Sequence, residues 1–216
     1  FTELIITALR EDRVSAGENV FSDVPETHKY AGTIHAARAL GIVSGEGKTK
    51  FNPDAEISCN AALKMLCCAL GYGDWAELRG GYPAGYTQTA KSIGLTKNVA
   101  SRGEGAVSRE DAAVLIYNFI NAPMFEIAQV GAASVGGRKN SDLTVIGEKW
   151  GLETLEGVIK SAGYVTMVPD CDIDESTITV GGKNFHCNVD DVEKYLGLDA
   201  KIFYDEDTNT VSAVYA

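Results

Sequence analysis

The chain has 216 residues, of which 45% are hydrophobic and 23% charged, an ordinary composition for a globular protein with a core. Its formal net charge of −11 argues against nucleic acid as a partner, because phosphate binding needs clustered lysine and arginine. No apolar run approaches the roughly 20 residues that a membrane-spanning helix needs, and no signal peptide is recognisable.

A pattern of about fifty residues occurs twice between residues 21 and 120. Aligning Gly41 with Gly94 gives a shift of 53 residues, and aligning Ser58 with Ser108 gives a shift of 50, so the intervening loop is shorter in the second copy. Residues 2–9 match the end of the first copy and indicate the closing helix of a further, partial copy. Repeated units of this length bury their apolar faces against each other, which favours an interaction scaffold over an enzyme.

Each full copy is predicted to hold an opening helix, a glycine-containing loop and a closing helix. In the first copy, residues 20–25 are extended, and helices are expected from Pro25 to about Leu40 and over 59–70, with Ser58 as the N-cap. The second copy repeats this order, with helices near 86–93 and over 109–121 and with Ser108 as the N-cap. Because the chain starts inside a repeat, we expect a fragment or a processed form.

The composition changes after Pro123. A strand is expected near 125–130, a linker or exposed loop over 131–142 because of its Gly, Ser and Ala, and a short helix near 143–150. From Leu155 the pattern is that of β-strands, with turns at Gly181–Gly182 and 205–209 and one short helix near 190–196.

The fold class is therefore α+β, with an N-terminal helical repeat bundle followed by a small β-rich domain, either a sheet or a barrel. The expected domains are repeats over 1–122 (1–20 partial, 21–72 full, 73–122 degenerate), a linker with a short strand and helix over 123–153, and the β domain over 154–216.

Neither the cysteines nor the histidines predict a metal centre or a catalytic set. The five cysteines show no C-x-x-C spacing and their odd number argues against a complete disulfide framework, although a Cys171–Cys187 bridge is left open. The acidic strings at 170–174 and 205–209 lack the glycine and glutamate of a calcium loop and are interpreted as acidic turns. We therefore expect no cofactor, no metal and no catalytic residues.

Three stretches of the first copy carry a family resemblance: FSDVP, then GIVSG, then FNPDAEIS before a helix that ends in ALGY. This pattern resembles the S-layer homology module, over about residues 1–122. The C-terminal part resembles, less closely, a small β domain that follows such modules in surface proteins of Gram-positive bacteria.

The resemblance implies non-covalent attachment to a secondary cell-wall polysaccharide, in grooves between repeats. It assigns ligand contacts to Asp23, Gly41 and Gly45, and to Ser108 and Arg109, where the family has a Thr-Arg-Ala-Glu signature. The first copy has Ser58-Cys59-Asn60 at that signature, without an arginine. It also has His28-Lys29 where His-Trp is common in the family.

The chemistry of these residue types fits acidic sugars, because arginine offers a planar fork for a carboxylate and glycine lets the backbone approach a ring. Structural roles are open for the same residues. Arg109 could pair with Glu110 or Asp111, Asp23 could cap the turn before Pro25, and the glycines could serve the backbone alone.

The leading hypothesis is a non-enzymatic protein of the cell wall or cell surface, outside the cell, whose partners are the secondary polysaccharide and peptidoglycan. Two alternatives remain: a degenerate scaffold that contacts other surface proteins, and the anchoring part of a cell-wall enzyme.

Overall fold

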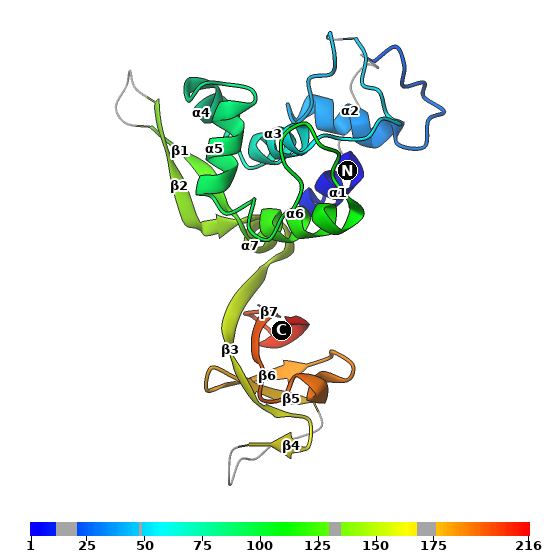
Figure 1. The fold of residues 1–216 in the computed structure, drawn as a ribbon. Coiled ribbons are helices and arrows are strands. Elements are labelled where there is room, and N and C mark those ends of the chain that lie inside the picture. The colour runs from blue at the N-terminus through cyan, green and yellow to red at the C-terminus, as the bar shows by residue number, and fades with distance from the viewer. Residues whose placement is uncertain (12–20, 48, 130–134, 168–175) are drawn as a thin grey trace. The chain divides into compact units, whose positions relative to one another are not determined.

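The chain divides into two compact units, Phe1–Val145 and Ile146–Ala216, which are called the helical unit and the β unit below. The computed structural model describes residues 1–11, 21–47, 49–129, 135–167 and 176–216. Figure 1 shows the helices of the first unit and the strands of the second, which together give the predicted α+β class. Among the described residues, no helix has the length and apolar character that crossing a membrane requires.

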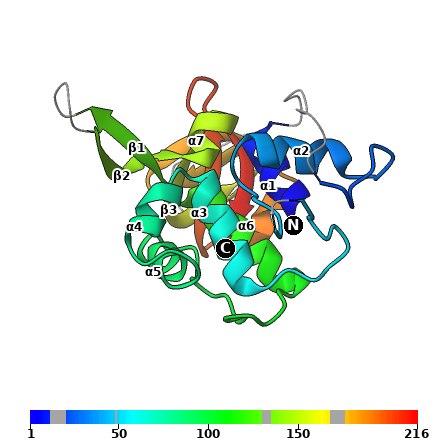
Figure 2. The same ribbon diagram turned by 90° about the horizontal axis from the view of Figure 1, so that it is seen from above.

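The helices of the helical unit follow the repeat. They are α1 (Thr2–Leu9), α2 (Ala31–Ala39), α3 (Cys59–Ala69), α4 (Gly73–Leu78), α5 (Ala84–Ser92) and α6 (Arg109–Asn121). The closing helix α1 packs against the opening helix α2, and the closing helix α3 packs in the same way against the opening helix α5. In Figure 2, α3 lies between the α4–α5 pair and the group of α1, α2 and α6. Each closing helix therefore contacts the opening helix of the next copy.

Serine side chains cap both closing helices, as predicted. The Ser58 hydroxyl accepts a hydrogen bond from the Ala61 N–H at 3.3 Å, and the Ser108 hydroxyl accepts one from the Asp111 N–H at 3.0 Å. Both serines have the extended backbone of an N-cap residue. The two copies therefore begin their closing helices in the same way.

Two helices differ from the prediction. The opening helix of the first copy begins at Ala31 rather than at Pro25, because residues 25–31 form successive turns in which the His28 N–H donates to the Pro25 carbonyl. Helix α4 was not predicted, since six residues are too few to show a helical period in the sequence.

One continuous core fills the helical unit. Its fully buried members come from all three copies and include Ile5, Ile34, Leu66, Leu115 and Phe119. Residues of the partial first copy are thus buried with those of the two full copies, as the repeat predicts.

A two-stranded antiparallel ribbon follows α6. It consists of β1 (Pro123–Gln129) and β2 (Val135–Thr144), so the predicted strand is present, whereas residues 135–142 are strand and not the predicted linker or loop. Pairing with β1 satisfies the backbone of a segment whose own β-propensity is low. The Phe125 N–H donates to the Leu70 carbonyl at 2.9 Å, and the Phe125 ring lies 5.1 Å from that of Tyr72, so the ribbon is attached to the helices.

The β unit is a closed barrel. After α7 (Val145–Trp150) its elements are β3 (Leu152–Ala162), β4 (Val165–Thr166), β5 (Thr177–Val180), β6 (Lys183–Cys187), the 3₁₀ helix η1 (Val192–Tyr195), β7 (Asp199–Asp205) and β8 (Thr210–Tyr215). The first part of β3 pairs with β7 and its last part pairs with β5. The circuit continues through β5–β6, the parallel pair β6–β8, and β8–β7.

This circular order is the connectivity of the five-stranded Greek-key barrel known as the OB-fold, with η1 between its third and fourth strands. The barrel core contains Ile159, Ile178, Val180, Phe185 and Ile202 among others. The predicted turns at Gly181–Gly182 and 205–209 are confirmed as the β5–β6 and β7–β8 connections. Asp205 accepts hydrogen bonds from the backbone and hydroxyl of Thr208, as expected for an acidic turn.

Truncation of a residue in the core that all copies build together should destabilise the helical unit. Leu66 is fully buried on α3, so we expect Leu66→Ala to lower the free energy of unfolding by about 2–5 kcal/mol through lost burial and a residual cavity. Leu78→Ala is the matched control, because Leu78 is 85% exposed and should change stability by no more than about 0.5 kcal/mol. Urea titrations followed by helical circular dichroism would test this, and equal effects of the two changes would contradict it.

Candidate functional site

The candidate site lies where the loop of the second copy meets the closing helix of the first. The N–H groups of Cys59 and Asn60 donate to the carbonyls of Gly105 and Gly103, both at 2.9 Å, and the Val107 N–H donates to the Ile57 carbonyl. The first N–H groups of a helix have no partner inside the helix. Here the second copy supplies those partners, so the two copies interlock at the start of α3.

The interlock closes position 59, where the resemblance expects an arginine. Cys59 is 2% exposed, and its thiol donates to the Ser101 carbonyl at 3.2 Å. Burial raises the pKa of this thiol, so it stays neutral. The side chain at position 59 is therefore uncharged and out of reach of a ligand.

A polar group lies beside this interlock. The Asn60 amide donates to Glu104 Oε1 at 2.7 Å, and the Tyr82 hydroxyl donates to the same oxygen at 3.4 Å. The Thr87 hydroxyl donates to Asn60 Oδ1 at 3.4 Å. The bond from Asn60, followed by smaller contributions from Ser58 and Tyr82, lowers the pKa of Glu104, so its carboxylate stays ionised and holds Asn60 and Tyr82 in place.

The ammonium group of Lys64 lies next to the same residues. It is 5.6 Å from the centroid of the Tyr82 ring and 5.6 Å from that of the Tyr86 ring, within the range of a cation–π contact. The Tyr86 hydroxyl donates to Glu77 at 2.8 Å. Burial, and then Glu77, raise the pKa of Tyr86, so this ring remains neutral. Asn60, Lys64, Tyr82, Tyr86 and Glu104 are called the Tyr82 cluster below.

Asp23 holds the loop of the first copy. Its carboxylate accepts the Phe51 N–H at 2.9 Å and the Asn52 N–H at 2.8 Å. These bonds, that of Asn52 first, lower the pKa of Asp23. The structure thus gives Asp23 a capping role, but for the loop at 51–52 and not for the turn before Pro25; its assignment to a ligand stays a prediction.

The second copy holds the equivalent loop with a carboxylate from a different position. Asp111, in the first turn of α6, accepts the Ala100 N–H at 2.8 Å and the Ser101 N–H at 2.7 Å. Phe51 and Ser101 both precede the N-cap serine of their copy by seven residues. The Ser101 hydroxyl, then the two N–H groups, lower the pKa of Asp111.

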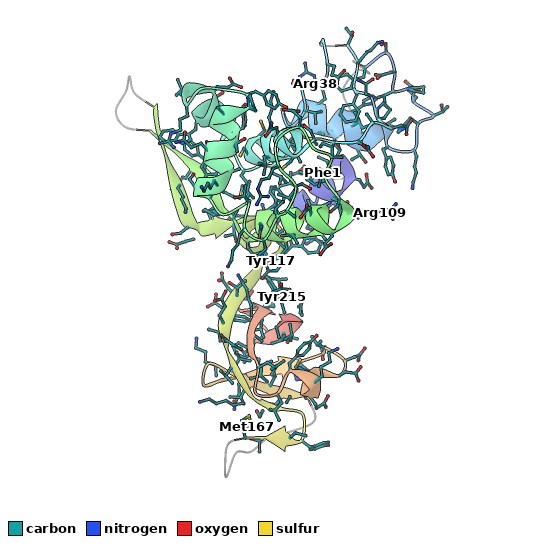
Figure 3. The ribbon with its side chains drawn as sticks, in the orientation of Figure 1. Phe1, Arg38, Arg109, Tyr117, Met167 and Tyr215 are labelled. Atoms are coloured by element: carbon teal, nitrogen blue, oxygen red, sulfur yellow. The ribbon has the colours of Figure 1, made fainter. Side chains whose placement is uncertain are left out.

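Arg109 is exposed at the start of α6, where Figure 3 labels it. One of its two predicted partners, Asp111, instead accepts hydrogen bonds from the backbone of the loop at 100–101. Within the part of the chain that the structure describes, the Arg109 guanidinium has neither an ion pair nor a hydrogen bond. Ser108, beside it, uses its hydroxyl as the helix cap. Arg109 is thus a charge that the described contacts leave available to solvent.

The two glycines to which the resemblance assigns ligand contacts differ in their surroundings. Gly41 has a positive φ of 72° after α2, with open space where a Cβ would lie. Gly45 has a φ of 76°, and a Cβ there would meet the Phe21 ring and the Lys50 carbonyl. Gly45 is therefore required by packing, whereas Gly41 meets the conformational demand of a helix end.

From the sequence, Tyr82 could either stack on a sugar or pack between repeats, and packing is favoured, whereas the structure leaves 46% of Tyr82 exposed. Lys64 was not predicted as a member of the site. The shift of 53 residues carries position 29 to position 82, so the aromatic residue that is lacking at Lys29 is present in the second copy as Tyr82. The repeat could therefore have identified Tyr82. No local signal identifies Lys64, because its neighbours come from a helix and a loop 18 or more residues away in sequence.

The other groups considered in the sequence form no site within the described part of the chain. His186 is exposed and Cys187 buried, as expected for neighbours on a strand. Cys171 and the acidic string at 170–174 lie outside the described residues. Among the described residues, no group of three or more His, Cys, Asp or Glu side chains is placed to hold a metal ion.

Comparison with known proteins supports the predicted resemblance. Residues 20–58 match the family model of the S-layer homology domain, over the segment that holds Asp23, α2 and the following loop. The chain is 32% identical over 107 residues, 50% of its length, to a protein of Thermoanaerobacter kivui named cell surface protein. It is 24% identical over 113 residues, 52% of its length, to the middle cell wall protein of Brevibacillus brevis.

These matches cover 13% and 10% of the two relatives, so the chain corresponds to a small part of each. No solved structure gives a significant match to the chain. The family resemblance is thus shown for an S-layer homology domain within the helical unit.

The carboxylate of Asp111 should stabilise the helical unit in a pH-dependent way. Its pKa is lower in the folded chain than the roughly 3.9 of an unfolded aspartate, so its contribution is present above about pH 4 and is lost as the pH falls through the folded-state value. We expect Asp111→Asn to lower the urea midpoint at pH 7, and this deficit to shrink at pH 3 and below. Glu110→Gln, on the same helical turn, is the control; a deficit unchanged between pH 7 and pH 2 would contradict the assignment.

Proposed function

We propose that the helical unit attaches the chain non-covalently to a secondary cell-wall polysaccharide, and that this region acts outside the cell as an anchor rather than as an enzyme. The observation that carries the proposal is the match of residues 20–58 to the S-layer homology domain. The names of the two relatives, a cell surface protein and a cell wall protein, agree with it.

The geometry of the helical unit supports carbohydrate as the ligand. Arg109 presents a free guanidinium that suits a carboxylate, and Tyr82 presents an aromatic ring that is 46% exposed. Because the chain carries a net charge of −11, an anionic polysaccharide needs such local cations to overcome the overall repulsion.

A second candidate is a scaffold that binds another surface protein. Two observations favour it: position 59 is closed and uncharged, and the β unit exposes large apolar side chains at Tyr164, Met167 and Leu198. Exposed apolar groups of this size are a feature of protein contact surfaces. In this alternative, the isolated chain would show no affinity for cell walls.

Wall binding can be tested by co-sedimentation with purified Gram-positive cell walls, before and after acid removal of the secondary polysaccharide. We expect the chain to sediment with intact walls and to remain in the supernatant with stripped walls. Equal sedimentation with both preparations, or with neither, would contradict the proposal.

Arg109 should contribute to this binding through its unpaired charge. We expect Arg109→Ala to weaken wall binding about tenfold while the urea midpoint stays unchanged, since charge-assisted hydrogen bonds contribute about 1.5–3 kcal/mol. Lys97→Ala removes another exposed positive charge from the helical unit and is the matched control. Equal binding by the Arg109 variant and the unmodified chain would remove Arg109 from the site.

A further inference from the structure

The β unit has an apolar surface where β3 turns into β4 and where β7 begins. Five large apolar side chains are exposed there: Val158, Tyr164, Val165, Met167 and Leu198. Among the described residues of this unit, only Trp150 and Tyr215 are further exposed apolar side chains of similar size. The exposed apolar groups of the β unit are therefore concentrated at one place, which is called the Met167 surface below.

Backbone hydrogen bonds bring the segments of the Met167 surface together. The Ile159 N–H on β3 donates to the Leu198 carbonyl at 3.0 Å. The Met167 N–H donates to the Lys160 carbonyl at 2.7 Å. The Met167 sulfur is 3.6 Å from the place that a Cβ on Gly197 would take, so Met167 lies against the segment that leads into β7. Figure 3 labels Met167 beside β4.

The side chains of this surface are of the kinds that form protein contacts. Tyr164 is 73% exposed and Met167 is 61% exposed, so most of their area is available to a partner. Tyrosine and methionine are enriched in the central part of protein–protein interfaces, and methionine adapts its shape to the surface that it meets. Clustered apolar groups with a polar rim mark such interfaces.

The rim of the Met167 surface is acidic. Four exposed carboxylates lie in or next to the segment that leads to Leu198: Asp190, Asp191, Glu193 and Asp199. No ion pair involves any of these four among the described residues. Over 158–167 and 190–199 the sequence has only two cations, Lys160 and Lys194, so carboxylates are in excess there.

The charge of the whole β unit has the same sign. Over Ile146–Ala216 there are 14 acidic residues and five lysines, so this unit holds −9 of the chain's net charge of −11. Such a charge opposes the approach of a second β unit, of an anionic polysaccharide and of nucleic acid. It favours a partner with an excess of lysine and arginine, because complementary charge accelerates association and excludes partners of like charge.

We propose that the Met167 surface docks a segment of another protein that is both basic and apolar. The apolar side chains of that segment pack on Tyr164, Met167 and Leu198, and its lysines or arginines lie over the acidic rim. The inference goes beyond wall attachment, because it concerns the β unit, and it holds independently of polysaccharide binding by the helical unit. It gives the scaffold candidate a surface and a partner chemistry.

The experiment measures binding of fluorescent peptides to the full chain by anisotropy. The probe is a short helical peptide with leucine on one face and lysine on the other. One control peptide has glutamate in place of lysine, and a second has serine in place of leucine. We expect both controls to bind at least about tenfold more weakly than the probe, because each lacks one of the two features that the surface matches.

Two pairs of substitutions locate the probe on the β unit. Tyr164→Ser with Met167→Ser should weaken its binding by about tenfold or more, whereas Leu78→Ser, at an exposed leucine of the helical unit, should have no effect. Glu193→Gln with Asp199→Asn should weaken binding about threefold and reduce its dependence on salt. Glu153→Gln, at an exposed position near the other end of β3, is the charge control. Urea midpoints establish that each variant is folded.

The possible outcomes separate this inference from the proposed function. Unchanged affinity in the Tyr164→Ser/Met167→Ser variant, or equal binding of the glutamate peptide, overturns the docking surface. Self-association of the unmodified chain in sedimentation velocity that this variant abolishes would make a second copy the occupant and overturn the basic partner. The variant should still sediment with cell walls as the unmodified chain does; failure of both to sediment contradicts wall anchoring alone.

Discussion

The hydrogen bonds between the loop at 101–107 and the first turn of α3 are the constraint on which the helical unit depends. They occupy the N–H groups of Cys59 and Asn60 that a helix leaves unpaired, so the first copy has a complete helix start only when the second copy is in place. The packing of α3 on α5 then buries the apolar faces of both copies. Neither copy is therefore a self-sufficient unit, which is the general behaviour of short repeats.

In each copy a carboxylate binds the backbone of the loop, but it precedes the loop in the sequence of the first copy and follows the loop in that of the second. Asp23 precedes its loop by 28 residues, whereas Asp111 follows its loop from the closing helix. The equivalent N–H groups of Phe51 and Ser101 are satisfied in both cases, so the requirement is for a charge-stabilised acceptor at that place and not for an aspartate at one sequence position. An aspartate that matches a family motif can thus be explained by the loop it supports, without reference to a ligand.

Regular local signals allowed much of the helical unit, and one turn of the β unit, to be predicted. The N-cap serines at 58 and 108, the helix at 109–121 and the turn at Gly181–Gly182 all depend on residues within a few positions of each other. The circular order of the barrel depends on pairings such as Leu152 with Asp205, which no local pattern specifies. The Tyr82 cluster is non-local in the same way, because α3, α5 and the loop at 101–107 must first be packed together.

The structure therefore divides the residues of the helical unit that were considered for binding into two groups with different roles. In the first copy, two residues that match the family motif serve the fold, because Asp23 holds a loop and Gly45 permits a close approach. Position 59, which departs from the motif, is buried. Charge and aromatic surface that remain accessible belong to Lys64, Tyr82 and Arg109. In a chain with a net charge of −11, the anionic polysaccharide that we propose as ligand would have to be attracted by these few local cations and not by the overall field. If the proposed wall binding uses the exposed Arg109, salt should accordingly weaken it, because charges in contact with solvent are screened.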